Sequence, residues 1–431
     1  MNRIQNTLLP LALAALAACG DGAGDVATEQ QPGTPAAPTP PASTPACSPG
    51  NGGIQLPAGF CAVVVADSLG GVRHLAVAPN GDVYAAVSTP RNGGGGVIAL
   101  RDADGDGRAE MKREIAVPPG SGIAISGGYL YFAPNDGVLR WRMAEGQLVP
   151  AGQPETVVTG LPTGGHTAKT IALDGRGALY VNIGSRSNSC QVADRAPGSP
   201  GEDPCRELAT RAGIWRFDAA RAGQTQAQGT RFATGIRNAV GLAVAPDGKV
   251  YAAQHGRDQL NTIAPRLYSD AKNAENPAEE LLQLAQGDDY GWPYCYFDTD
   301  LKRKTLAPEY GGNANEAGRC AAIKAPIATF PAHWAPMALA VYDGAQFPAR
   351  FRNGTFVSFH GSWNRAPLPQ AGFRVSFVPA GAPGGAYEDF ATGFQTGGHR
   401  PMGLAVGPDG SLYIGDDAGG RIWRVIHTGA R

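Results

Sequence analysis

The sequence predicts an all-β fold, a six-bladed β-propeller with loop insertions. The main observation is a repeated phrase, in which an apolar stretch, a turn with Asp or Asn before Gly, and a second stretch centred on Tyr follow one another. Four copies are clear and two are weaker, and they begin at residues 75, 123, 171, 242, 339 and 404. The first two intervals of 48 residues suit one four-stranded blade each, and longer later intervals leave room for insertions.

Composition supports this fold and argues against one class of partner, nucleic acids. The chain has 61 Gly and 35 Pro among 431 residues, which favours turns over long helices. Lys and Arg number 36 and Asp and Glu 37, so the net charge is −1. Such a balance gives no general attraction to a phosphate backbone, and we expect no nucleic-acid partner.

The N-terminal residues are typical of an export signal followed by a tether. Residues 1–18 include an apolar run too short to span a bilayer, and LAAC at 16–19 resembles a bacterial lipobox. We expect a lipoprotein signal peptide and lipidation of Cys19, with an ordinary cleavage site as the alternative. Residues 19–46 are rich in Pro, Gly and Thr and lack aromatic residues, so they predict a tether before a folded domain at 47–431. The expected location is the periplasmic side of the envelope, held to the outer membrane by the lipid alone.

The other six cysteines are an even number suited to an oxidising compartment. Six cysteines allow fifteen connectivities. Pairing of neighbours closes the shortest loops and is therefore favoured: Cys47 with Cys61, Cys190 with Cys205, and Cys295 with Cys320. No CxxC or CxxCH occurs, which argues against a zinc ribbon and against a c-type haem.

The repeat also predicts where a site would lie. Residues just before the first stretch and just after the second should meet around the central channel of a propeller. The first set contains His166, Thr167, Arg237, Asn238, His399 and Arg400, with His333 or Trp334 from a weaker copy. The second set contains residues 184–188, 255–258, 360–365 and 416–417. A ring of Arg, His and Asn can bind carboxylates and move protons, although each residue alone could equally cap a strand.

Several segments resemble the glucose/sorbosone dehydrogenase family, the propellers that use pyrroloquinoline quinone (PQQ). The resemblance covers about residues 55–427 and rests on GGHTAK at 164–169, GIRNAVGL at 235–242, GDDYGWP at 287–293, FHGSWNR at 359–365 and RPMGL at 400–404. The HGSWNR segment is closer to the sorbosone and pyranose dehydrogenase branch than to the soluble glucose dehydrogenases. The resemblance implies a six-bladed fold and oxidation of a sugar.

The resemblance also implies roles for individual residues. His166 matches the general base that takes the sugar hydroxyl proton. The residues expected to hold PQQ are Lys169, Arg237, Asn238, His360, Trp363, Asn364, Arg365 and Arg400. Those expected at a Ca²⁺ ion are Gly256 and Arg257, through their carbonyls, and Asp258. Ser185 stands where the glucose enzymes pair an Asp with the His, so Asn188 or a backbone carbonyl is expected to orient the imidazole.

Two other segments have simpler interpretations. DADGDG at 102–107 begins like a calcium loop, but Arg113 occupies its twelfth position, so a turn at a blade edge is the better interpretation. LLQLA at 281–285, in the long insertion at 260–330, predicts a short helix at most, with a strand about equally favoured.

Three functional hypotheses follow. The first is a PQQ- and Ca²⁺-dependent dehydrogenase of pyranoses or sorbosone-like sugar aldehydes, which passes electrons to a separate cytochrome or quinone because the chain has no haem motif. The second is a Ca²⁺-dependent lactonase-type hydrolase, which would gather Glu, Asp and Asn around an axial metal. The third is a non-catalytic binding protein. The His- and Arg-rich ring favours the first.

Overall fold

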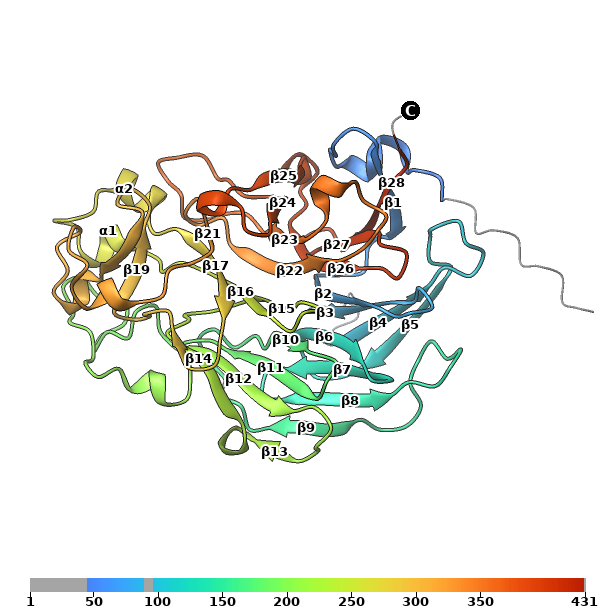
Figure 1. The fold of residues 1–431 in the computed structure, drawn as a ribbon, viewed down its shortest axis with the longest axis horizontal. Coiled ribbons are helices and arrows are strands. Elements are labelled where there is room, and N and C mark those ends of the chain that lie inside the picture. Colours follow the sequence, from blue (N-terminus) through green and yellow to red (C-terminus); the bar gives the residue numbers. More distant parts are fainter. Residues whose placement is uncertain (1–44, 89–95, 430–431) are drawn as a thin grey trace, which may run out of the picture. The chain divides into compact units, whose positions relative to one another are not determined.

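The computed structural model describes residues 45–88 and 96–429. Six sheets form the blades of a propeller, and the four main strands of each blade pair antiparallel, so the predicted all-β class is confirmed (Figure 1). Among these described residues, no helix is long and apolar enough to cross a membrane. The lipobox with Cys19 and nearly all of the predicted tether lie outside the described residues.

The first three blades follow one another along the chain. Blade 1 is β2 (Val72–Val77), β3 (Val83–Val87), β4 (Gly96–Arg101) and β5 (Met111–Ala116). Blade 2 is β6 (Gly120–Ser126), β7 (Tyr129–Pro134), β8 (Val138–Arg142) and β9 (Glu155–Thr159), extended by β13 (Gln224–Thr225). Blade 3 is β10 (Ile171–Leu173), β11 (Ala178–Ile183), β12 (Gly213–Asp218) and β14 (Thr230–Thr234), extended by β18 (Asp288–Asp289).

The last three blades close the ring. Blade 4 is β15 (Gly241–Val244), β16 (Val250–Gln254), β17 (Glu279–Leu284) and β21 (Ala328–Phe330). Blade 5 is β22 (Pro336–Tyr342), β23 (Gly354–Phe359), β24 (Arg374–Pro379) and β25 (Glu388–Ala391). Blade 6 is β26 (Pro401–Val406), β27 (Leu412–Asp416) and β28 (Ile422–His427), and its outermost strand is β1 (Phe60–Ala66). Because β1 pairs with β28, the two ends of the propeller are joined in one sheet.

The remaining elements lie in connections. Blade 4 has two long connections: α1 (Leu260–Ile263) and α2 (Asp270–Glu275) lie between β16 and β17, and a hairpin of β19 (Cys295–Asp298) and β20 (Arg303–Leu306) lies between β17 and β21. The second connection is called here the insertion of blade 4. The 3-10 turns are η1 (Pro49–Gly53), η2 (Arg206–Ala209), η3 (Gln226–Gln228), η4 (Pro308–Tyr310), η5 (Gly318–Ala322), η6 (Ala349–Phe351), η7 (Pro383–Gly385) and η8 (Phe394–Gly397). Residues 281–284 lie in strand β17, so the strand interpretation of LLQLA was correct and the helix interpretation was wrong.

The repeated phrase has a local physical cause. In blade 4, the Asp247 carboxylate accepts a hydrogen bond from the Lys249 amide at 3.0 Å, and Gly248 between them has φ of 88°. Blade 6 repeats this with Asp409, Gly410 and Ser411. Asp and Asn form such turns readily, and Gly accepts the left-handed conformation without strain. The phrase therefore specifies the hairpin between the first and second strands of a blade.

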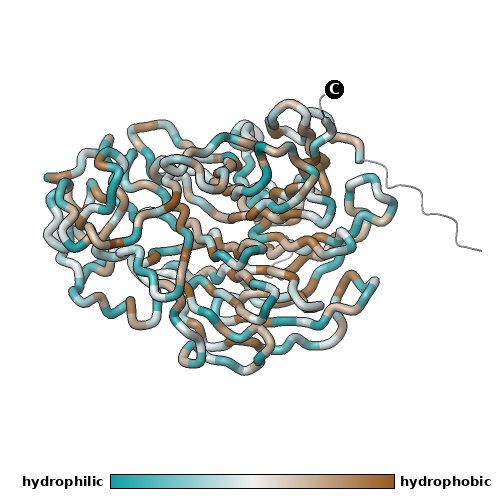
Figure 2. Tube along the Cα trace, in the orientation of Figure 1, coloured by the Kyte–Doolittle hydropathy of each residue, from teal (hydrophilic) through white to brown (hydrophobic). Residues whose placement is uncertain are grey.

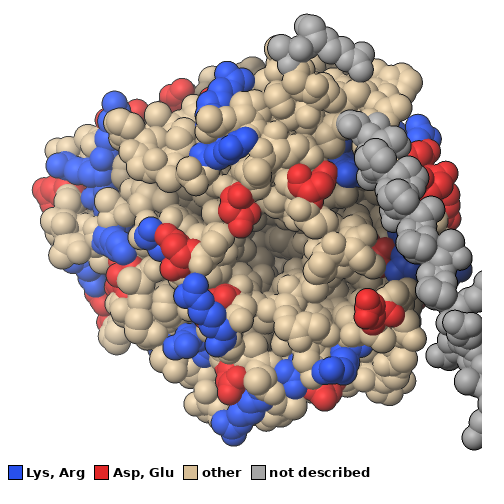
Figure 3. Space-filling view, turned by 45° about the vertical axis from the view of Figure 1, so that its right-hand side comes forward, with Lys and Arg blue, Asp and Glu red and all other residues tan. Residues whose placement is uncertain are grey.

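Packing between sheets holds the blades together. One apolar cluster joins Tyr84 and Val97 of blade 1 to Phe132 and Trp141 of blade 2, and other clusters join later neighbours in the same way. Each innermost strand neighbours the innermost strands of the two adjacent blades, which closes the ring around the axis. The trace is apolar mainly within the strands (Figure 2). One face is hollowed near its centre (Figure 3).

All three predicted disulfides are confirmed. Cys47 is bonded to Cys61, Cys190 to Cys205 and Cys295 to Cys320. The first ties the segment before β1 to that strand, and the third lies within the blade 4 insertion. Each bridge closes a loop of 14 to 25 residues, so the pairing of sequence neighbours was the correct choice.

Candidate active site

The two sets of positions predicted to meet around the channel do meet. The amide of His166, before β10, donates to the Ser185 carbonyl after β11 at 3.0 Å. In blades 4 to 6 the bond runs the other way, because the amides of the loop after the second strand donate: His255 to the Asn238 carbonyl, His360 to the Ala335 carbonyl and Asp417 to the Arg400 carbonyl. Blades 3 and 4 are joined directly, because the Ser185 amide donates to the Arg237 carbonyl at 2.8 Å. Four blades thus present one continuous set of polar residues.

His166 is oriented through one ring nitrogen. Its Nδ1 lies 2.9 Å from the Ser185 carbonyl and 3.0 Å from the Ser185 hydroxyl. Because a carbonyl only accepts, Nδ1 carries the proton, and Nε2 keeps its lone pair. Of the two expected orienting groups, the backbone carbonyl is therefore the correct one. Burial, followed by the nearby Arg237 guanidinium, lowers the pKa of His166 to about 3, so the ring is neutral at ordinary pH.

Asn188, Arg237 and Asp258 form the central polar group of the site, called here the arginine cluster. The Arg237 Nη2 donates to the Asn188 Oδ1 at 3.0 Å and to the Asp258 Oδ2 at 2.9 Å. Asn188 also binds the backbone of Asp258 twice, at 2.9 Å each. Burial acts to raise the pKa of Asp258, but Arg237 and Arg195 outweigh it and hold that pKa at about 2. Asn238, also predicted here, accepts from Asn182 at 3.3 Å.

The residues predicted at a Ca²⁺ ion already have protein partners. The Gly256 carbonyl accepts from the Arg237 Nη1 at 2.9 Å. The Asp258 carboxylate accepts from Arg237, from Arg195 and from the Asn364 amide at 3.0 Å. The expectation for Arg257 concerned its carbonyl, and its side chain turns away from this group to form a buried ion pair with Glu309 of η4. The Gly256 carbonyl and the Asp258 carboxylate therefore face a guanidinium.

Lys169 lies fully buried beside the site. Its ammonium donates to the Thr167 carbonyl at 2.6 Å, and among the described residues that is its one hydrogen-bond acceptor. Burial, aided by Arg211, lowers the pKa of Lys169 to about 8, so the group is still mostly protonated at pH 7. A buried ammonium with three N–H groups and one acceptor is suited to an anionic ligand.

The blade 6 side carries a second set of charges. The His360 Nε2 lies 2.9 Å from the Asp417 Oδ2, and Arg73 of β2 donates to the same oxygen at 2.8 Å. The Arg400 Nη1 is 3.2 Å from the His360 Nδ1. Since the guanidinium can only donate, His360 carries its proton on Nε2 and both its nitrogens are engaged. His360 is therefore less available as a base than His166.

The loop after β23 places its three predicted cofactor residues differently. Asn364 points into the site and binds Asp258. Arg365 points away, and donates to the Ala332 carbonyl at 2.9 Å. Trp363 is 67% exposed, although Ser362 beside it is buried and its hydroxyl binds Gln370 and Ala371. Trp363 thus offers a flat, exposed apolar surface on the loop whose next residue, Asn364, contacts the arginine cluster.

Two further predicted ring residues point elsewhere. The His399 Nδ1 binds the buried Asp416 carboxylate at 2.6 Å and its ring packs against Trp423 of β28. The His333 Nε2 lies 2.7 Å from the Asn273 carbonyl of helix α2. These contacts bind strands and the first long connection of blade 4 together, which is the strand-capping alternative that the sequence left open.

Sequence reasoning missed two buried site residues. His74 of β2 lies 2.9 to 3.2 Å from the carbonyls of Ser121, Val240 and Met337, which belong to three other blades. Its signal was its position directly before the first repeat, at Leu75. Glu279 of β17 accepts from the Gly256 amide at 2.8 Å, and burial raises its pKa to about 8. Nothing in the sequence distinguished Glu279 from any other strand residue.

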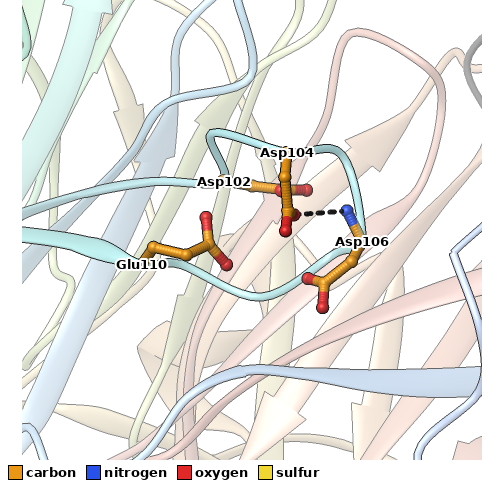
Figure 4. A group of neighbouring side chains, drawn as sticks. All are labelled: Asp102, Asp104, Asp106 and Glu110. Atoms are coloured by element: carbon orange, nitrogen blue, oxygen red, sulfur yellow. Dashed lines mark hydrogen bonds between the residues drawn. The ribbon is translucent and has the colours of Figure 1, made fainter.

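The loop at 102–110 joins β4 to β5 and is the predicted turn. It also gathers four carboxylates whose oxygens lie within 4.8 Å of one another: Asp102, Asp104, Asp106 and Glu110 (Figure 4). Hydrogen bonds from the loop's own amides to Asp102, Asp104 and Glu110 account for much of this arrangement. The fourth carboxylate, Glu110, stands at the ninth position of the loop, whereas the twelfth position is Arg113.

Comparisons with known proteins agree with this fold. A family model described as TrAA12-like matches residues 54–428. A pyrroloquinoline quinone-dependent pyranose dehydrogenase of Coprinopsis cinerea is 25% identical over 316 residues, which are 63% of this chain and 41% of that protein. The chain spans less than half the length of the curated relatives it matches.

Solved structures show the same fold at lower identity. The iodide structure of the Trichoderma reesei Carbohydrate-Active Enzymes Family AA12 protein has a TM-score of 0.71 at 20% identity, and covers 87% of this chain and 98% of that one. The holo form of the PQQ domain of pyranose dehydrogenase from Coprinopsis cinerea has a TM-score of 0.69 at 19% identity, over 86% and 97% of the two chains.

Proposed function

The chain belongs to the TrAA12-like family, and from this premise we propose that it is a PQQ-dependent dehydrogenase of pyranose sugars. The observation that carries the proposal is the fully buried ammonium of Lys169, three residues after His166 in the loop before β10. Lys169 lacks an anionic partner among the described residues, and Arg237 and Arg400 lie in the same ring of loop ends. PQQ is a tricarboxylate, and ammonium and guanidinium groups are the donors that carboxylates prefer.

These residues fit the cofactor by their chemistry. Lys169 and Arg400 would each bind a carboxylate, and Asn238 and Arg237 would lie against the cofactor. When bound, PQQ supplies the two-electron acceptor for the hydride of the sugar. His166 Nε2 takes the proton of the sugar hydroxyl as the hydride leaves carbon, so the C–OH group becomes C=O. The Ser185 carbonyl keeps the Nδ1 proton in place, which directs the Nε2 lone pair to this task.

Trp363 supports a sugar as the substrate class. Its exposed indole adjoins Asn364, which is anchored on Asp258. We propose that this surface packs on the apolar face of a pyranose ring, in place of the cofactor contact expected from the sequence. Whether the sugar is a pyranose or a sorbosone-like aldehyde is decided by the substrate panel below.

Two of the groups expected at a Ca²⁺ ion, the Gly256 carbonyl and the Asp258 carboxylate, do not fit a cation as they are arranged. Arg237 occupies both the Gly256 carbonyl and the Asp258 carboxylate, and Arg195 adds a second positive charge. A divalent cation would have to displace a guanidinium from both oxygens. We therefore assign no step to calcium. The same arrangement disfavours a calcium-dependent lactonase.

The remaining parts of the proposal concern location and electron transfer. We propose that Cys19 is lipidated and holds the protein on the periplasmic side of the envelope, because the lipobox precedes a tether. The chain contains no CxxCH motif, so a separate cytochrome or quinone would accept the electrons.

The test is a PQQ titration followed by turnover. Purified protein is titrated with PQQ, with absorbance as the readout, and then assayed with a dye acceptor against a panel of pyranoses and sugar aldehydes. We expect saturable binding and dye reduction with at least one sugar. The matched variant His166→Asn should bind PQQ but lose roughly 10²- to 10⁴-fold in kcat. Absence of PQQ binding by the wild type would refute the proposal and favour a binding protein.

A further inference from the structure

Two loop segments form the arginine cluster, and their side chains alternate between two sides. Asn188 and Asp258 meet Arg237 on the site side. Their neighbours Ser189 and Arg257 turn the other way, where the Arg257 Nη2 is 3.3 Å from the Ser189 hydroxyl. The two segments therefore contact each other on both sides: through Arg237 on the site side, and through Arg257 and Ser189 on the opposite side.

The contact behind the cluster is completed by Glu309, which lies in η4 of the long insertion. Its carboxylate binds both Nη atoms of Arg257, with the Nη1 at 2.6 Å, and accepts from the Ser189 hydroxyl at 2.7 Å. The Arg257 and Glu309 side chains are 3% and 0% exposed. Tyr310 adds a bond from its hydroxyl to the Ser189 carbonyl at 3.0 Å. The 3-10 turn η4 of the insertion thus hydrogen-bonds to the Ser189 segment of blade 3 and to the Arg257 segment of blade 4.

The ion pair between Glu309 and Arg257 also affects the charge balance of the arginine cluster. Arg257 and Arg237 are both buried, and the charge of Arg257 disfavours the charged form of Arg237. Glu309 neutralises Arg257, so that Asp258 stays paired with Arg237. Removing one partner of a buried pair leaves an uncompensated charge, which is strongly destabilising locally. An unpaired Arg257 would compete for Asp258, the nearest carboxylate along the chain.

Two disulfides lie close in sequence to the residues of this contact. Cys190, next to Ser189, is bonded to Cys205, and the loop closed by Cys295 and Cys320 contains Glu309. The insertion is therefore braced where it supplies the carboxylate.

We propose that Glu309 is a positioning residue for the arginine cluster, so that the insertion of blade 4 forms part of the site although it lines none of the predicted ring. The proposal rests on the proposed function only where cofactor affinity is the readout. Glu309 acts through Arg257 and Ser189 and touches no ligand itself. Residues that orient a site's direct ligands typically change affinity or activity by roughly 10- to 100-fold when mutated.

The test compares Glu309→Gln with Glu280→Gln. Glu280 forms an ion pair with Lys304 whose side chains are 5% and 4% exposed, so its loss also leaves a buried charge unpaired, but the Glu280 carboxylate makes no hydrogen bond to either segment. The first readout is amide hydrogen exchange of peptides covering 186–190 and 255–258 in protein without PQQ. The Asp258 amide is the key probe, because it donates to Asn188. The second readout is PQQ affinity.

We expect Glu309→Gln to speed exchange of the Asp258 amide and to weaken PQQ binding by about tenfold or more, and Glu280→Gln to change neither. The double variant Arg257→Met with Glu309→Met, which leaves no unpaired charge, should recover part of the affinity. Equal exchange and equal affinity in the two single variants would overturn the proposal and leave Glu309 a structural residue. If the wild type binds no PQQ, the proposed function fails, while the exchange readout still decides the role of Glu309.

Discussion

A pH–rate profile tests the role of His166 most sharply. Burial and Arg237 lower its pKa to about 3 from the ordinary 6.5. A base with a pKa of 6.5 would be about 3% neutral at pH 5, whereas one with a pKa near 3 would be about 99% neutral. Lowering the pH from 7.5 to 5 should therefore leave kcat/KM nearly constant. An unperturbed histidine would lose about thirtyfold over the same range.

The assay is dye-linked oxidation of the best sugar at several pH values from 4.5 to 8, with PQQ saturation checked by absorbance at each pH. Circular dichroism at each pH establishes that the protein is folded. The variant Ser185→Ala serves as a control. It removes the hydroxyl contact to the His166 Nδ1 but keeps the backbone carbonyl that orients the ring, so its pH–rate profile should have the same shape as that of the wild type. An acidic limb with a midpoint between 6 and 7 in the wild type would refute the argument that burial and Arg237 set the basicity of His166.

Four further predictions follow from particular residues. His74 has a pKa lowered to about 4 by burial, so its neutral form contributes stability that is present above pH 6.5 and lost as the pH falls towards 4. His166 and His255 add pH dependence of the same sign in both proteins, so denaturant unfolding should show that the wild type loses about 3 kcal/mol more than His74→Gln over this range. Equal losses in the two proteins would contradict this prediction. Trp363→Ala should raise KM for sugars and leave Tm and PQQ affinity unchanged, since the indole is exposed. An unchanged KM would contradict the proposed contact between the indole and the sugar. EDTA should not weaken PQQ binding, because Arg237 holds the candidate calcium oxygens, and a Ca²⁺-dependent affinity would contradict this. Cys19→Ala should move the protein from the membrane fraction to the soluble one, and a wild type already soluble would exclude the lipid anchor.

Local sequence determined the parts of this protein whose physics is local. A turn such as Asp247-Gly248 needs only an Asx side chain and a residue that accepts positive φ, so each copy of the phrase specifies its own hairpin. Six copies then imply six blades, and six blades imply that the loop ends meet. The disulfides were predictable for a related reason, because closing a short loop between neighbours has the smallest entropy cost. His166 and Arg237 were found because they share one phase of the repeat.

Long-range packing decided the rest. His74 meets carbonyls of three other blades, and Glu309 reaches Arg257 and Ser189 from 52 and 120 residues away. The side to which a loop residue turns depends on the partner that the folded chain brings to it. Arg257 therefore joined Glu309 and Arg365 joined Ala332, whereas Arg237 took the oxygens expected to hold calcium. A repeat predicts where a backbone goes, but a buried charge goes to the counter-charge that the tertiary structure places beside it.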